Sequence, residues 1–241
     1  MGDVQMTFVD HLRELRNRLA VAILAVAAFT ILGYVFREQI FAFIKAPLGP
    51  VEDKINFQAI SLTEGFLSNI RLAVYTGIFL GLPFIFYEGM MFIWPALKPS
   101  ERRVMGGALA ASFTLAYIGI AVAYILIFPL IIPALIDYNL DDVSLVPQIR
   151  SFVNFVFKFM IGFALAFQLP VVVVVLVRLG VIEHKWLKKY RKYVIVLVFV
   201  AAALLTPPDP VSQLLMAAPL LLLYEVSIWV SAFFAGKKKE V

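Results

Sequence analysis

The sequence contains no cysteine and few charged residues. Lys, Arg, Asp and Glu make up 15% of its 241 residues, hydrophobic residues make up 62%, and the mean hydropathy is +0.93. Soluble domains carry about 25% charged and about 45 to 50% apolar residues, so this composition argues against a water-soluble protein and predicts a membrane protein. The absence of cysteine excludes disulfide frameworks, iron-sulfur clusters and cysteine-based zinc sites.

Sequence patterns of enzyme chemistry are also missing. The two histidines, His11 and His184, lie in different charged flanks, and the chain has no HExxH, GxSxG, P-loop or GxGxxG motif. No aspartate lies inside an apolar stretch, as an intramembrane aspartyl enzyme would require. We therefore expect no catalysis, no cofactor and no bound metal.

Long apolar runs dominate the sequence, and they predict an all-α integral membrane protein that forms a single domain. A spanning helix needs roughly 20 apolar residues. The fifth run has only about a dozen before the Thr206–Pro210 turn, too few for an ordinary bilayer unless the membrane thins locally or its ends are buried. The acids before the first run argue against a cleaved signal peptide. The six predicted spans cover about 19–36, 72–94, 104–128, 152–177, 194–205 and 211–234.

The basic residues are distributed unevenly between the two sides of this layout. Fifteen of the 21 Lys and Arg residues lie before span one, after spans two and four, and in the tail, whereas the opposite loops are acidic. The positive-inside rule therefore predicts that both termini are cytoplasmic. We find no internal repeat. The expected segments are a cytoplasmic amphipathic segment 1–18, external loops 37–71 and 129–151, and a basic cytoplasmic tail 235–241.

Two acids in the basic flanks are candidate binding groups. Leu12, Leu15 and Leu19 recur at helical spacing around Glu14, which indicates an amphipathic helix. Glu14 either forms an i,i+4 pair with Arg18, worth about 0.2 to 0.5 kcal/mol, or binds a ligand. In the basic loop between spans two and three, Ser100 is the expected N-cap of span three. Glu101, in the first turn of that span, either compensates the helix dipole or binds a cationic partner.

Polar residues inside the spans are costly in hydrocarbon, so each is expected to face protein or water and is a functional candidate. They are Glu88, Lys158, Gln168 and Glu225, with Asp209 at the external rim. The alternative for each charged one is interfacial placement or helix-helix bonding. Pro170, two residues after Gln168, frees the carbonyl of Ala166 and predicts a kink in the fourth span.

Three separated segments together resemble the TatC family, the multispanning core subunit of the twin-arginine protein translocase. Residues 11–16 read HLRELR, residues 92–103 read FIWPALKPSERR and residues 206–213 read TPPDPVSQ. Residues 62–66 (LTEGF) and 163–170 (FALAFQLP) add to the likeness, which covers essentially the whole chain in order.

The resemblance implies a concave, glove-like bundle of six helices with short fifth and sixth spans, placed in the cell inner membrane. It implies a receptor for twin-arginine signal peptides that recruits single-span TatA/TatB-type subunits, forms homo- and hetero-oligomers in the lipid bilayer and transports folded proteins. It places signal-peptide binding at Glu14 and Glu101, beside Arg16, Arg102 and Arg103. Carboxylates accept the planar fork of a guanidinium bidentately, which lysine cannot reproduce.

The resemblance also implies a surface for partner helices at Gln168, Thr206, Gln213 and Asp209. Where the family usually has a glutamate in span four, this chain has Gln168. That change removes an ionisable group and puts in doubt what the acid contributes to partner contact or transport.

Two other functions are compatible with a six-span protein. One is a small-solute or ion transporter that uses Glu88, Lys158 and Gln168 along a polar pathway, against which stand the missing repeats and the lack of paired acids. The other is an inert assembly scaffold. Binding of an Arg-Arg peptide, compared with a Lys-Lys peptide, separates the receptor from both.

Overall fold

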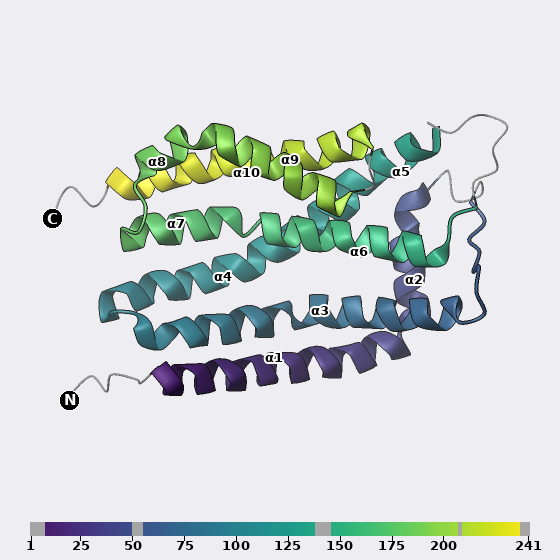
Figure 1. Ribbon diagram of the computed structural model, residues 1–241, viewed down its shortest axis with the longest axis horizontal. Coiled ribbons are helices and arrows are strands. Elements are labelled where there is room, and N and C mark those ends of the chain that lie inside the picture. The colour runs from purple at the N-terminus through teal and green to yellow at the C-terminus, as the bar shows by residue number, and fades with distance from the viewer. Residues whose placement is uncertain (1–7, 50–54, 138–145, 207–208, 237–241) are drawn as a thin grey trace.

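Long helices form the whole framework of the protein. The computed structural model describes residues 8–49, 55–137, 146–206 and 209–236, and within them the extended contacts are limited to an isolated bridge between Gln58 and Gln148. The long helices lie side by side, and the described part of the chain begins at Phe8 and ends at Gly236 at the same end of the bundle (Figure 1). We call this the terminal end, and the end that carries α2 the opposite end. Within these described ranges five helices are long and apolar enough to cross a membrane, which confirms the all-α membrane fold.

The predicted spans correspond to successive helices or helix pairs. The first span continues without a break from the amphipathic segment, and the third and fourth are each built from more than one helical segment. The spans are α1 (Phe8–Val35), α3 (Glu64–Ile93), α4 (Pro99–Val122) with a π-helical turn (Ala123–Ile127) and α5 (Phe128–Asp137), α6 (Ile149–Ala166) with α7 (Leu169–Leu179), α9 (Arg191–Leu205), and α10 (Pro210–Gly236).

The last two spans differ in length. Helix α9 has 15 residues, roughly 22 Å at the α-helical rise, which is less than the roughly 30 Å hydrocarbon core; the short fifth span is confirmed. Helix α10 has 27 residues, so the expectation of a short sixth span is wrong. Pro210 starts α10 directly after the turn, and the helix continues past Pro219 to Gly236.

The two segments expected to be external loops contain more helix than their charge suggested. Segment 37–71 holds α2 (Arg37–Lys45) and the first two turns of α3, and segment 129–151 holds most of α5 and the start of α6. Charged residues lower hydropathy, but Arg, Glu and Lys are good helix formers, so hydropathy alone predicts helices that are too short. Residues 1–7, 50–54, 138–145 and 237–241, which belong to the predicted terminal segments and loops, lie outside the described residues.

Prolines create the local breaks, and side chains from neighbouring helices compensate for them. Helix α6 ends at Ala166 and α7 begins at Leu169, which is the kink predicted from Pro170. Pro83, inside α3, cannot donate to the carbonyl of Phe79. The hydroxyl of Tyr117 on α4 donates to that carbonyl at 3.1 Å. The carbonyl that Pro83 leaves without a donor inside α3 therefore forms a hydrogen bond between two spans.

Glycines let α1 and α3 approach closely. A Cβ on Gly77 would lie 2.8 Å from the carbonyl oxygen of Val26, and a Cβ on Gly81 would lie 2.9 Å from the Val26 side chain. On the other helix, a Cβ on Gly33 would lie 2.9 Å from the carbonyl oxygen of Ala73. Small residues at these positions permit backbone contact between spans, and they hold the start of α1 beside the end of α3.

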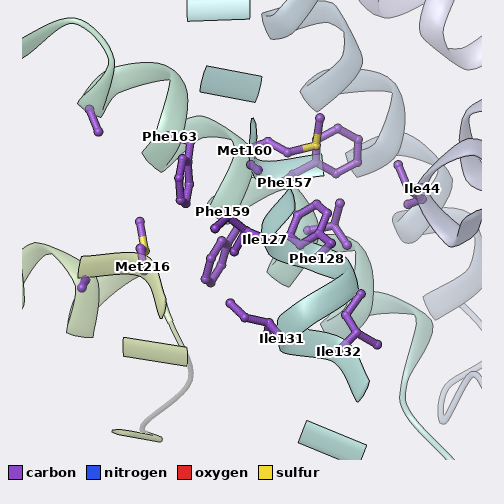
Figure 2. Packing of buried hydrophobic residues seen from close by; sticks show 14 of the residues in the cluster. Ile44, Ile127, Phe128, Ile131, Ile132, Phe157, Phe159, Met160, Phe163 and Met216 are labelled. Carbon is purple, nitrogen blue, oxygen red and sulfur yellow. The ribbon is translucent and has the colours of Figure 1, made fainter. Parts of the chain in front are cut away.

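A cluster of large apolar side chains forms the core. Phe128 of α5 and Phe159 and Phe163 of α6 are fully buried, as is Met216 of α10. Figure 2 shows Phe128, Phe159, Ile127 and Ile131 gathered where α5 passes α6, with Ile44 of α2 on one flank and Met216 on the other. This packing fixes α6 at the centre of the molecule, between α3, α4 and α10.

Candidate functional site

Two carboxylates at the terminal end share one guanidinium. Arg18 Nη1 donates to Glu88 Oε2 at 3.0 Å, and Arg18 Nη2 donates to Glu14 Oε1 at 3.4 Å. Glu14 and Arg18 lie one turn apart on α1, whereas Glu88 comes from α3. We call Glu14, Arg18 and Glu88 the acidic cluster. The i,i+4 pair expected between Glu14 and Arg18 is confirmed, with Glu88 as an additional partner.

The acidic cluster carries an unmatched negative charge. Two carboxylates and one guanidinium sum to a formal charge of −1, and Glu88 is only 8% exposed. Glu14 Oε2 is buried and receives no hydrogen bond from the described residues. A partly buried carboxylate is stabilised by a paired cation, so the cluster can accept a second cationic group.

An aromatic contact attaches the start of α1 to the end of α3. The ring of His11 stacks on that of Phe92 with centroids 4.3 Å apart and planes 18° from parallel. The leucines of the predicted amphipathic stripe, Leu12, Leu15 and Leu19, are exposed on the isolated chain. The stripe is therefore open to lipid, while the face that carries Glu14 turns toward α3.

Glu101 lies in the first turn of α4. The helix starts at Pro99 with Lys98 as its N-cap residue, so the prediction of Ser100 as N-cap is wrong. Proline is favoured at the first helical position, and this moves the start of the helix two residues earlier. Glu101 Oε2 accepts a hydrogen bond from the backbone N–H of Lys98 at 3.0 Å, as an acid at N3 does in a capping box.

The other predicted signal-peptide residues lie at the same end of the bundle, on different surfaces. The guanidinium of Arg102 lies 5.8 Å from the centre of the Trp94 ring, and Arg16 is exposed and bonded to Asn17 at 3.1 Å. Arg103 lines an apolar groove of about 530 Å³ between α4, α7 and α10. The starts of α1 and α4 flank the end of α3 (Figure 1), but Glu14 and Glu101 bond to separate partners.

Gln168 occupies the break between α6 and α7 and bonds to two backbone carbonyls. Its Nε2 donates to the carbonyl of Ser112 on α4 at 3.2 Å and to that of Ala164 at 3.3 Å. A side-chain amide has two N–H donors, and both are used here. An ionised glutamate would have no donor for either carbonyl.

The turn between α9 and α10 holds the remaining predicted residues. Thr206 donates to the carbonyl of Ala202 at 3.0 Å, and Gln213 donates across to the carbonyl of Phe199 at 3.0 Å. Asp209 Oδ1 accepts the backbone N–H of Ser212 at 2.7 Å and so caps α10. Asp209 Oδ2 and the hydroxyl of Ser212 are buried and make no hydrogen bond with the described residues.

The residues of the transporter hypothesis lie in separate places. Glu88 is in the acidic cluster, Gln168 is bonded to α4, and Lys158 lines a groove between α3 and α6. Glu225 of α10 forms an ion pair with Arg191 of α9 at 2.7 Å, which matches helix-helix bonding. Within the described residues no group of three His, Asp or Glu side chains could hold a metal ion.

Sequence reasoning did not find the bond between Arg18 and Glu88. The available signal was an acid inside the second span and an arginine at the start of the first. Pairing them required knowing that α1 runs back along α3. The spacing of Gly77 and Gly81, which lie at the contact, permits close helix packing but does not say which helix packs there.

Comparison with known proteins places these features in one family. Residues 10–219 match the family described as Sec-independent protein translocase protein (TatC). The chain is 36% identical to the TatC protein of Carboxydothermus hydrogenoformans, covering 99% of this chain and 100% of that protein, and 35% identical to that of Escherichia coli, covering 95% and 89%. A crystal structure described as a twin-arginine translocase receptor, TatC, superposes with a TM-score of 0.83 at 33% identity, over 92% of this chain and 98% of that one.

Proposed function

This chain belongs to the TatC family, the Sec-independent protein translocase proteins, and on that premise we propose that it binds twin-arginine signal peptides at its terminal end. It is a multi-pass membrane protein and a subunit of the twin-arginine translocase. In this proposal Glu14 and Glu101 grip the paired arginines of the peptide, and Arg16, Arg102 and Arg103 border the site. Its work is binding and recruitment, without a catalytic step.

The observation that carries the proposal is the unmatched charge of the acidic cluster. Arg18 supplies one guanidinium to two carboxylates and leaves the buried Oε2 of Glu14 without a donor among the described residues. A peptide guanidinium has five N–H donors in a planar fork, so it can reach this oxygen while still contacting a second acceptor. Glu101, at the same end of the bundle, has one oxygen engaged by Lys98 and supplies the second acid.

We propose a separate surface for single-span TatA/TatB-type subunits, formed by Gln168 and by Thr206, Asp209 and Gln213 at the α9–α10 turn. The support is the unused hydrogen-bonding capacity of buried oxygens at the turn, Asp209 Oδ2 and Ser212 Oγ. Asp209 is partly exposed, so its carboxylate can turn toward a polar group on a partner helix, and a buried oxygen without a donor is costly in an apolar medium.

The charge distribution supports a cytoplasmic terminal end in the cell inner membrane. Twelve of the 21 basic residues lie in described segments at or near this end, and cytoplasmic flanks carry the excess of Lys and Arg. Signal peptides of folded cargo would therefore meet the acidic cluster before export begins.

Binding of matched peptides to the purified full-length protein tests the proposal. Wild type is expected to bind an Arg-Arg signal peptide at least tenfold more tightly than the same peptide with Lys-Lys. Glu14→Gln and Glu101→Gln are each expected to weaken Arg-Arg binding about tenfold or more, because each removes a charge-assisted hydrogen bond worth about 1.5 to 3 kcal/mol. Fluorescence anisotropy of labelled peptides measures both.

Thr206→Val is the control for this experiment. It alters the α9–α10 turn and leaves the acidic cluster intact, so peptide affinity is expected to stay at the wild-type value. Equal binding of the Arg-Arg and Lys-Lys peptides, or unchanged affinity in both glutamate variants, would rule out docking at these acids.

A further inference from the structure

Three cations converge on a groove at the half of the bundle that contains the opposite end. The groove, of about 410 Å³, lies between α3 and α6 and is lined by Arg71 and Tyr75 on one side and Arg150, Asn154 and Lys158 on the other, with Ile70 and Val74 at its edge. We call it the cationic groove. It lies away from the acidic cluster and from the α9–α10 turn, so neither proposed binding surface includes it.

A hydrogen bond sets the register of the two helices here. The hydroxyl of Tyr75 donates to Asn154 Oδ1 at 3.4 Å, and α3 and α6 both start at the opposite end and run in the same direction (Figure 1). Arg71 and Arg150 each lie four residues before a member of this bond, so they are at about the same depth. Lys158 lies one turn deeper than Asn154 on the same face of α6.

These three side chains form no ion pair within the described part of the chain. Glu64, which lines a neighbouring cavity with Arg150, accepts its hydrogen bonds from the backbone N–H groups of Ile60 and Ser61. Only six of the 21 basic residues lie outside the fifteen described above, and three of the six meet in this groove. Within the described residues these like charges lack an ion-paired acid and repel one another, so the groove is suited to an anion.

The surroundings indicate an anion that carries hydrocarbon. Ile70 and Val74 are 37% and 38% exposed beside the cations, and Lys158 is an exposed residue within a stretch apolar enough to span the membrane. A lysine at such a position extends its ammonium toward the interface while its methylene stem contacts lipid. Phospholipid phosphates lie at that interface, and their acyl chains would lie along Ile70 and Val74.

We propose that the cationic groove binds the phosphate headgroup of an anionic phospholipid in the leaflet at the opposite end. Arg71 and Arg150 contact the phosphate from either side, and Lys158 reaches it from deeper in the membrane. The Tyr75–Asn154 bond joins α3 to α6 between the two arginines and the deeper Lys158.

Native mass spectrometry of the full-length protein tests this proposal. The protein is released from detergent that contains equal amounts of phosphatidylglycerol and phosphatidylcholine with identical acyl chains. Wild type is expected to retain phosphatidylglycerol preferentially. The triple variant Arg71→Gln/Arg150→Gln/Lys158→Gln is expected to lose that preference more than tenfold, since each cation near a membrane surface contributes roughly fivefold to anionic lipid affinity.

Lys185→Gln/Lys188→Gln/Lys189→Gln removes the same charge from exposed positions at the terminal end and is expected to keep the preference. If the triple variant fails to fold, single variants take its place, each with a loss of roughly fivefold. An equal loss in the control, or retention of the preference in folded groove variants, overturns the proposal. Displacement of the lipid by excess inorganic phosphate assigns the groove to free phosphate, and a wild type without lipid preference rejects the lipid outright.

Discussion

At the scale of single residues, the position of one arginine determines the charge available at the terminal end. The side chain of Arg18 is 35% exposed, so its two ion pairs contribute little net stability, as is usual for solvent-screened pairs. Their effect is on charge: Arg18 neutralises one of the two carboxylates, Glu14 or Glu88, and leaves the other for a ligand. In the proposed receptor, Arg18 therefore competes with the guanidinium of the peptide for these carboxylates.

Opposite substitutions in the acidic cluster should shift peptide affinity in opposite directions. Arg18→Gln removes the competitor and is expected to tighten binding of the Arg-Arg peptide several-fold, since each ion pair that the peptide no longer has to share is worth about 1 kcal/mol. Glu88→Gln lets Arg18 pair fully with Glu14 and is expected to weaken binding by a similar factor. Isothermal titration of both variants measures the change, and Lys188→Gln, at an exposed position of the terminal end outside the proposed site, is the control.

Affinities that change in the same direction in the Arg18→Gln and Glu88→Gln variants would contradict competition by Arg18. Such a result would indicate that the three residues only support the packing of α1 against α3. Thermal unfolding of each variant, measured alongside, separates a loss of binding from a loss of structure.

At the scale of helices, prolines determine where spans bond to one another. Pro83 leaves the Phe79 carbonyl without its usual donor inside α3, and the Tyr117 hydroxyl of α4 takes that place. Pro170 ends α6, and Gln168 in the resulting break reaches Ser112 on α4. Helix α4 is therefore hydrogen-bonded to both neighbours at points where their own backbone ladders are interrupted.

A double-mutant cycle tests the compensation at Pro83. Tyr117→Phe is expected to lower the free energy of unfolding by about 0.6 to 1.5 kcal/mol, because it leaves the Phe79 carbonyl without a partner. In a Pro83→Ala background the new N–H at position 83 can bond to that carbonyl, so the same change is expected to cost less. Unfolding in mixed detergent and dodecyl sulfate gives the four free energies.

Tyr87→Phe is the matched control for the cycle, because Tyr87 is an exposed tyrosine of α3. It is expected to leave the free energy of unfolding within about 0.5 kcal/mol of wild type. Equal costs of Tyr117→Phe with and without Pro83 would show that the hydroxyl does not compensate for the proline.

The sequence predicted the elements better than their contacts. Features that act locally could be predicted. The long apolar runs predicted the spans, Pro170 predicted the kink, and the Thr206–Pro210 turn predicted the short α9. The helical content of 37–71 was missed because hydropathy falls at Arg37 and Glu38 while helix propensity does not. The start of α4 was placed at Ser100 because a good capping side chain outweighed Pro99 in the prediction. The Arg18–Glu88 bond depends on the packing of α1 against α3 and has no local signature.

At the scale of the whole molecule, shape and charge distribution combine. The described part of the chain begins at Phe8 and ends at Gly236 at one end of the bundle (Figure 1), and the same end carries the acidic cluster and Glu101. In the proposed function, the basic residues at this end hold it at the cytoplasmic face, while the carboxylates bind the arginine pair of the peptide. Under that proposal, orientation in the membrane and ligand choice depend on charges of opposite sign placed close together.

The absence of cysteine makes this orientation directly testable, because any introduced cysteine is the only thiol in the chain. Leu62 at the opposite end and Lys185 at the terminal end are both exposed, so each thiol would react readily. In intact spheroplasts a membrane-impermeant maleimide is expected to label Leu62→Cys fully and Lys185→Cys only after lysis, with the parent chain as an unlabelled control. Labelling of Lys185→Cys before lysis would put the acidic cluster outside the cell, where no signal peptide awaits export, and would refute the receptor function together with the orientation.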